Sequence, residues 1–151
     1  MDICLKEQLY AHCLNYVEER LSRLQKNIGT LQEALTSETK SSAGDKHETG
    51  RAMIQLEREK LGQQLAEAQN LKEVFRKIPL KTTANTISLG SLVQTTGLHY
   101  YLSISVGEIK LQGQTFYAIA PNTPIGKLLM GKTKGDAVIF NKKEFTILTI
   151  N

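Results

Sequence analysis

The sequence has no tryptophan, three prolines and two cysteines in 151 residues. With 40% hydrophobic and 23% charged residues besides, this composition is typical of ordered proteins rather than disordered ones. No stretch approaches the roughly 20 apolar residues that span a bilayer, and the first residues lack the basic-then-apolar order of a signal peptide. We therefore expect a cytoplasmic protein that does not bind a membrane.

The two cysteines are too far apart to form a disulfide with each other. Cys4 and Cys13 lie on one predicted helix, about 13 Å apart at 1.5 Å per residue. We interpret them as small buried apolar residues of a reducing compartment, because His12 beside Cys13 is too little for a metal site or a nucleophile.

The common signatures of catalysis are missing as well. The sequence contains no nucleophile elbow, no phosphate-binding glycine loop, no HExxH and no paired CxxC. An enzyme that acts on its own is therefore not expected.

Positive charge is concentrated in the C-terminal half. The net charge is +4, yet residues 1–78 hold equal numbers of basic and acidic residues, so the excess lies beyond residue 78. There seven lysines face only Glu108, Asp136 and Glu144. This excess is too weak to argue sequence-specific DNA reading, but it favours an acidic partner surface or a nearby nucleic-acid backbone.

The N-terminal half is predicted to be helical. Residues 2 to about 42 contain no proline and one glycine, and their apolar residues recur in alternating steps of three and four, as in the a/d seam of a coiled coil. A second helix is expected from about Lys46 to Lys77, because Pro79 disfavours helical geometry in the residue before it. The first seam consists of Leu14, Val17, Leu21, Leu24, Ile28, Leu31 and Leu35.

The two helices are predicted to pair with each other. Apolar residues on both sides of the tip pair off at position numbers that sum to 89, which places a turn between Gly44 and Asp45. Residues 1–78 are thus expected to form a long antiparallel coiled-coil hairpin with its tip near 43–48. The pairs are Leu35 with Ile54, Ile28 with Leu61, Leu24 with Leu65, Leu21 with Ala68 and Leu14 with Phe75, and Met53 and Leu71 are also expected to face the first helix.

The C-terminal half changes to β character after a linker at 79–85. Residues 86–151 contain short β-branched or aromatic runs separated by glycine or asparagine, which predicts a small α+β domain. One short helix is expected within it, with Thr123 as N-cap, Pro124 at the first helical position and Gly131 just past the end. The runs are Ile87 to Val93, Tyr101 to Val106, Ile109 to Leu111, Phe116 to Ala120, Ala137 to Phe140 and Phe145 to Ile150.

Two acidic residues at the tip allow two interpretations. Asp45 followed by Glu48 is a variant of the capping box, and both charges favour the positive end of a helix. Alternatively, the two carboxylates deliver oxygen ligands to a Mg²⁺ ion that another protein holds in part, since Mg²⁺ takes only one or two protein carboxylates. Both can hold at once, and His47 between them is interpreted as a solvated side chain.

Two segments resemble the bacterial Gre transcript-cleavage factors (GreA and GreB). They are the tip Gly44-Asp45-Lys46-His47-Glu48 and, more specifically, the stretch from Pro121 to Lys132 followed by Gly135-Asp136-Ala137-Val138. That family carries a Ser-Pro-Ile-Gly-Lys-like turn and helix, then Gly-Asp-Glu-Val. Its architecture is also similar over the whole chain, with a helical hairpin, a linker and an FK506-binding-protein-like (FKBP-like) domain.

The resemblance implies an accessory factor for RNA polymerase. The hairpin would enter the secondary channel of the polymerase, close to nascent RNA and DNA, while the C-terminal domain docks at the channel rim. Asp45 and Glu48 would help to hold a second Mg²⁺, shared with the polymerase, and a water in its active site. Backtracked RNA would then be cleaved by the polymerase, and the factor would act as a monomer.

The sequence departs from the family pattern just after the tip, and other functions stay open. Where the family reads Glu-Asn-Ala-Glu-Tyr, this chain reads Glu48-Thr49-Gly50-Arg51-Ala52, and position 46 is a lysine. One alternative is a regulator of the same shape that occupies the channel without cleavage. Others are a peptidyl-prolyl isomerase, although few aromatic residues are present to form a proline pocket, and an oligomeric coiled-coil protein.

Overall fold

The computed structural model describes the backbone of residues 2–40, 45–83 and 85–151, and the side chains of residues 5–37, 49–83 and 85–151. Internal contacts divide the chain into two compact units. We call residues 17–73 the hairpin unit, and residues 1–16 with 74–151 the sheet unit. The division falls within both long helices, so the base of the predicted hairpin is grouped with the β domain.

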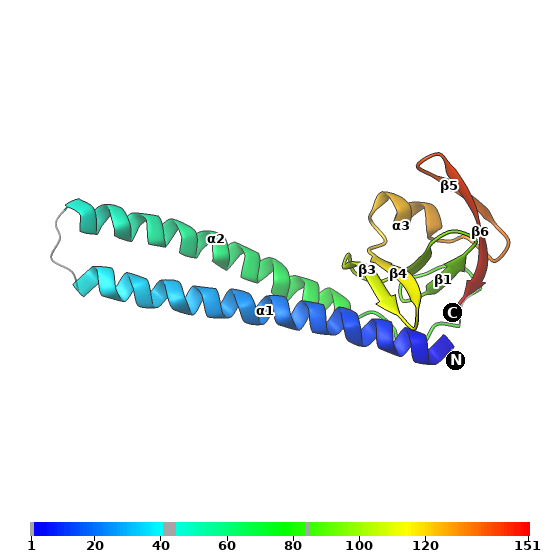
Figure 1. The fold of residues 1–151 in the computed structure, drawn as a ribbon, viewed down its shortest axis with the longest axis horizontal. Coiled ribbons are helices and arrows are strands. Elements are labelled where there is room, and N and C mark those ends of the chain that lie inside the picture. Colours follow the sequence, from blue (N-terminus) through cyan, green and yellow to red (C-terminus); the bar gives the residue numbers. More distant parts are fainter. Residues whose placement is uncertain (1, 41–44, 84) are drawn as a thin grey trace. The chain divides into compact units, whose positions relative to one another are not determined.

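Two long helices account for the N-terminal half. α1 spans Asp2–Lys40 and α2 spans Asp45–Arg76, and within the hairpin unit they run side by side (Figure 1). The predicted helical hairpin is thereby confirmed. The observed ends lie within two residues of the expected ones, because the apolar spacing and the absence of proline define both helices locally.

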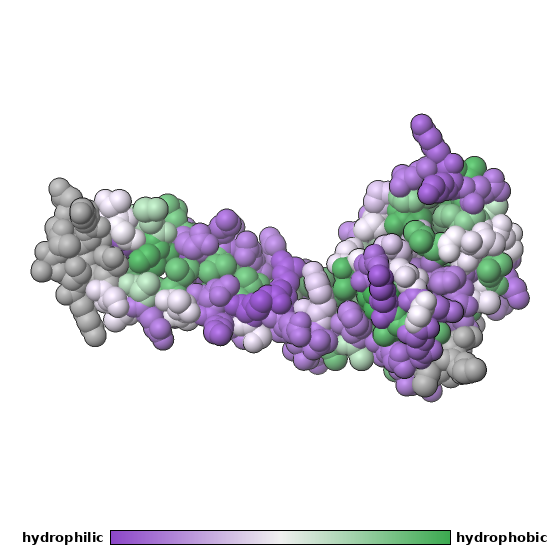
Figure 2. Space-filling model, viewed as in Figure 1, coloured by the Kyte–Doolittle hydropathy of each residue, from purple (hydrophilic) through white to green (hydrophobic). Residues whose placement is uncertain are grey.

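The two helices pack through the predicted seam. Three of the mirror pairs, Ile28 with Leu61, Leu24 with Leu65 and Leu21 with Ala68, fall in one apolar cluster that Leu31 also joins. Burying such a side chain stabilises the fold by about 1.5–3 kcal/mol. The seam is therefore covered within a single chain, and Figure 2 shows apolar residues among hydrophilic ones along this unit.

The prediction that Met53 lies on the inner face of α2 is wrong. Met53 is 66% exposed, and Leu56, three positions on, is 67% exposed. Successive residues of a helix point about 100° apart. Because Ile54 and Leu61 take the inner side, the side of the helix that carries Met53 and Leu56 faces solvent.

Six strands in the described residues form a single sheet in the order β3-β4-β2-β1-β6-β5. β2 and β4 pair in parallel, whereas every other neighbouring pair is antiparallel. The α+β class is therefore confirmed, with a mixed sheet. The strands are β1 (Leu92–Thr95), β2 (His99–Leu102), β3 (Gly107–Leu111), β4 (Gln114–Ile119), β5 (Ala137–Phe140) and β6 (Lys143–Ile150).

Two of the hairpin connections contain only two residues. Gln112 and Gly113 join β3 to β4, and Asn141 and Lys142 join β5 to β6; all four have positive φ, as type I′ turns require. These turns match the twist of the flanking strands, so the register of each strand pair follows from its turn.

The short helix α3 (Pro124–Leu129) covers part of the sheet (Figure 1). Thr123 is its N-cap and Pro124 its first residue, as predicted. Gly131, just past the end, has φ +82°, the left-handed geometry expected after a helix. Ile125 and Leu129 pack into the core of the sheet together with Ile87, Val93, Tyr100, Leu102, Val138, Phe145 and Ile147.

The start of the chain belongs to the core of the sheet unit. Leu9 and Cys13 of α1 and Phe75 of α2 are fully buried, and the Cys13 Sγ lies 3.8 Å from the Ser103 Oγ. Cys13 is thus a small buried residue, as predicted. No helix in the described part of the chain is long and apolar enough to cross a membrane.

Candidate functional site

The predicted tip pair lies at the beginning of α2. Asp45 is the first residue of this helix and Glu48 follows three positions later, a spacing that places two residues on neighbouring positions of a helix surface. The side chains of both residues lie outside the described ones. Their capping and their metal-assisting roles therefore both stay predictions.

The first described residues after the tip expose both polar and apolar side chains. Thr49 and Arg51 are exposed, and Met53 and Leu56 add two exposed apolar side chains further along α2. The distal part of the hairpin thus presents contact surface of both kinds to solvent.

Metal ligands are sparse in the rest of the chain. Among the described side chains, no group of three or more His, Cys, Asp and Glu residues is placed to hold a metal ion. The described side chains alone therefore form no such cluster.

The segment that carries the strongest resemblance builds the fold of the sheet unit. The Thr123 Oγ1 accepts from the Gly126 N–H at 3.2 Å and donates to the Ala120 carbonyl at 2.7 Å. A Cβ added to Gly126 would lie 2.3 Å from that carbonyl oxygen, so only glycine fits. This agrees with the interpretation of residues 124–127 as a turn that defines the fold.

Asp136 closes the turn before β5. Its carboxylate accepts from the Thr133 N–H at 2.8 Å and from the Thr133 hydroxyl at 3.1 Å. The backbone hydrogen bond, followed by the hydroxyl, lowers the pKa of Asp136. Asp136 is thus held as a structural anion.

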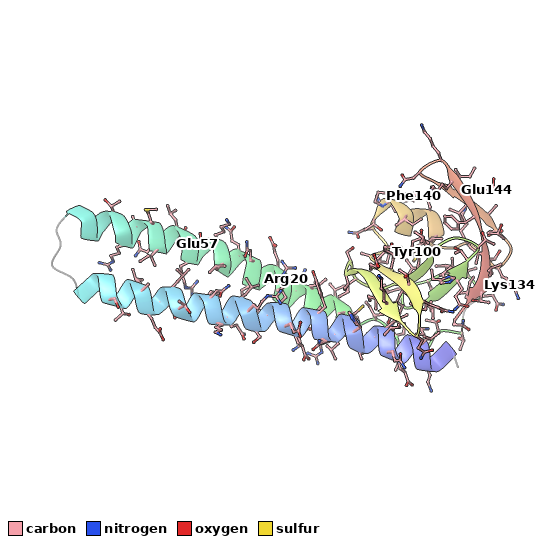
Figure 3. The ribbon with its side chains drawn as sticks, in the orientation of Figure 1. Arg20, Glu57, Tyr100, Lys134, Phe140 and Glu144 are labelled. Atoms are coloured by element: carbon pink, nitrogen blue, oxygen red, sulfur yellow. The ribbon has the colours of Figure 1, made fainter. Side chains whose placement is uncertain are left out.

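An aromatic pocket in the sheet unit was not foreseen from the sequence. Its volume is about 400 Å³, and Tyr100, Phe140 and Phe145 supply rings to its wall, with Leu98 beside them. The Tyr100 and Phe145 ring centroids are 6.0 Å apart, and Figure 3 shows Tyr100, Phe140 and Glu144 in this unit. The few aromatic residues of this half are therefore sufficient to form an apolar pocket, because strand pairing gathers them.

The buried thiol of Cys13 has low nucleophilic reactivity. Burial is the main cause that raises the pKa of Cys13 to about 11, and the contact with Ser103 opposes it. Since the thiolate is the reactive form, Cys13 is suited to packing and not to nucleophilic catalysis.

Comparisons with known proteins give little beyond this geometry. A scan of protein-family models and a search of curated proteins found no match. Among solved structures the chain is similar to one described as the transcription factor Gfh1, with 19% identity, a TM-score of 0.39 and coverage of 91% of this chain and 92% of that one. A likeness this distant carries no conclusion about fold or function.

Proposed function

We propose that the protein is a Gre-type transcription elongation factor. Its hairpin enters the secondary channel of RNA polymerase, and the factor stimulates the intrinsic cleavage of backtracked RNA by the polymerase. Arrested elongation complexes are thereby rescued. The protein is an accessory factor and not an enzyme by itself.

The observation that carries this proposal is the position of the two tip acids. Asp45 and Glu48 lie in the first turn of α2, the second helix of the hairpin. A hairpin of two helices brings its tip into a space too narrow for a globular domain. The motif resemblance at 44–48 and 121–138 supports the same assignment.

The roles of the tip residues follow from carboxylate chemistry. Mg²⁺ bound with the polymerase would position and activate the attacking water. Asp45 and Glu48 would offer oxygen ligands of the kind that this ion prefers. Their spacing by three residues lets both carboxylates approach one site from the same helix turn.

The C-terminal domain, residues 86–151, would dock the factor on the polymerase. Its excess of lysines favours an acidic surface of the partner. This domain would be FKBP-like, and the factor would act as a monomer in the cytoplasm.

The test is RNA release from a backtracked complex of the cognate polymerase. Asp45→Asn/Glu48→Gln should abolish stimulated cleavage while keeping a good helix cap, since asparagine caps about as well as aspartate. Glu59→Ala/Glu67→Ala, which removes two exposed acids further along α2, serves as the matched control. Full cleavage by the Asn/Gln variant would refute the metal-assisting role.

The departure after the tip favours a second candidate, a regulator that occupies the channel without cleavage. Gly50 and Arg51 stand where the family carries alanine and an acid. In this case the wild type competes for the channel and cuts nothing. Competition with a cleaving factor on the same complex separates the two candidates.

The aromatic pocket favours a candidate from another class, a peptidyl-prolyl isomerase, since rings are the usual lining of proline sites. An assay of proline isomerisation should use the full chain, because residues 1–16 belong to the sheet unit. Turnover lost in Tyr100→Ala and Phe140→Ala would support this candidate. An oligomeric coiled coil would instead show a mass that rises with concentration in sedimentation.

A further inference from the structure

A second pocket lies between the beginning of α1, the linker and the residue after β6. It has a volume of about 260 Å³, and its wall includes Lys6, Leu80, Thr82 and Asn151. All of these residues belong to the sheet unit. The proposed polymerase role does not use this pocket.

Lys6 is buried in the wall of this pocket. The residue is 4% exposed, and its Nζ donates to the Thr82 Oγ1 at 2.9 Å. An ammonium group has three N–H donors, and among the described residues Lys6 makes this one hydrogen bond and no ion pair. Burial lowers the pKa of Lys6. A buried cation without a counter-charge is costly, and a bound anion would offset that cost.

A second donor in the same wall lacks a partner. The Asn151 Nδ2 is buried and has no acceptor among the described atoms. Lys81 adds another positive charge to the lining, and the carboxylate of Glu7 opposes it. Among the side chains of this lining, two are therefore positive and one is negative.

We propose that this pocket binds a small monocarboxylate with an apolar body. One carboxylate oxygen would accept from the Lys6 Nζ and the other from the Asn151 Nδ2, while Leu80 and the lysine stems contact the apolar part. A monocarboxylate fits better than a phosphate monoester. The latter carries between one and two charges and three acceptor oxygens, which the carboxylate of Glu7 would repel.

The experiment uses the full chain with butyrate as the probe and inorganic phosphate and chloride as controls. Butyrate should raise the Tm by a saturable few degrees, because a ligand that binds only the folded state stabilises it. In ¹³C-lysine NMR the titration of Lys6 should move to higher pH when butyrate binds. The proposal would be overturned if butyrate, phosphate and chloride raised the Tm equally and without saturation.

Two variants and a matched control complete the test. Lys6→Met should lose the response to butyrate, while Lys134→Met, at an exposed lysine, should respond like the wild type. If Lys6→Met does not fold, Asn151→Leu keeps the backbone bonds to Leu92 and should weaken binding about tenfold, the worth of a hydrogen bond to a charged group. An undiminished response in either variant would overturn the proposal.

Asp2 lies one helical turn before Lys6, and its side chain lies outside the described ones. A variant of Asp2 therefore tests whether Asp2 is the counter-charge of Lys6. If Asp2 already neutralises Lys6, Asp2→Asn should create a butyrate response that the wild type lacks, and the proposal fails. If the pocket takes an external anion, the wild type and Asp2→Asn should both respond.

Discussion

The ring of Phe75, near the end of α2, lies against the ring of Tyr10 on α1, with centroids 4.6 Å apart. Phe75 is fully buried, so this pair joins the two helices at the base of the hairpin within the sheet unit. The mirror pattern paired Phe75 with Leu14. The observed ring partner is one helical turn earlier, and the planes of the two rings are tilted by 32°.

Phe75→Ala should lower the free energy of unfolding by about 3–5 kcal/mol, the usual cost of an aromatic side chain removed from a core. Val74→Ala is the matched control, because Val74 is 45% exposed and its loss should change stability by less than about 0.5 kcal/mol. Urea unfolding followed by circular dichroism measures both. Equal losses in the two variants would contradict the contact with Tyr10.

Gly29→Ala and Gly126→Ala should have opposite effects. A Cβ at Gly29 of α1 meets nothing within 4 Å, so alanine should stabilise the helix by about 1 kcal/mol. A Cβ at Gly126 would lie 2.3 Å from the Ala120 carbonyl oxygen, so alanine there must displace the backbone before α3. Thermal unfolding should show a higher Tm for the first variant and a lower one for the second. A rise of the Tm in Gly126→Ala would refute the close approach.

Tyr101→Phe should leave stability unchanged or raise it by up to about 1 kcal/mol. The Tyr101 hydroxyl is buried without a hydrogen-bond partner among the described residues, and burial raises its pKa. Removing the hydroxyl removes an uncompensated desolvation cost. Tyr101→Ala, which also removes the buried ring, should instead cost several kcal/mol, about as for other aromatic residues. A large loss of unfolding free energy in Tyr101→Phe, measured by urea unfolding, would contradict this and would mean that the hydroxyl has a hydrogen-bond partner.

Asp136→Asn should make the protein less sensitive to acid. The folded pKa of Asp136 is lowered, so its carboxylate stabilises the fold above its unfolded pKa of about 3.9. That stabilisation is lost as the pH falls from there through the folded value. Urea unfolding between about pH 2 and pH 7 should therefore show a shallower decline for the variant. Thr133→Val removes the hydroxyl donor and keeps the N–H. Its stability should decline with falling pH more steeply than that of Asp136→Asn and less steeply than that of the wild type.

Arg51→Glu should increase stimulated RNA cleavage if the proposed function holds. It restores the acid that the family carries after the tip, and Arg51 is exposed, so the stability should change by less than about 0.5 kcal/mol. Cleavage of a backtracked complex at matched factor concentrations measures the effect. Arg58→Glu, further along α2, controls for the change of charge. An unchanged rate in Arg51→Glu would mean that the departure at this position does not limit cleavage.

Much of the hairpin and of α3 could be predicted from sequence because their signals are local. The steps of three and four define one face of α1, and Thr123, Pro124 and Gly131 mark both ends of α3 within nine residues. The prediction for Met53 was wrong because a neighbour in sequence, Ile54, competes for the same inner position. At the tip, the roles of Asp45 and Glu48 stay predictions.

The sequence alone determined the two long helices, the short helix α3 and the change to β character after them, since periodicity and capping act over a few residues. The predicted turn between Gly44 and Asp45 lies outside the described residues. The tertiary structure decided which strands pair, including the parallel contact of β2 with β4. It also gathered Tyr100, Phe140 and Phe145 in one wall, and placed Lys6 against Thr82, which lies 76 positions away. These contacts depend on which faces meet across the whole fold, and no local pattern encodes such a choice.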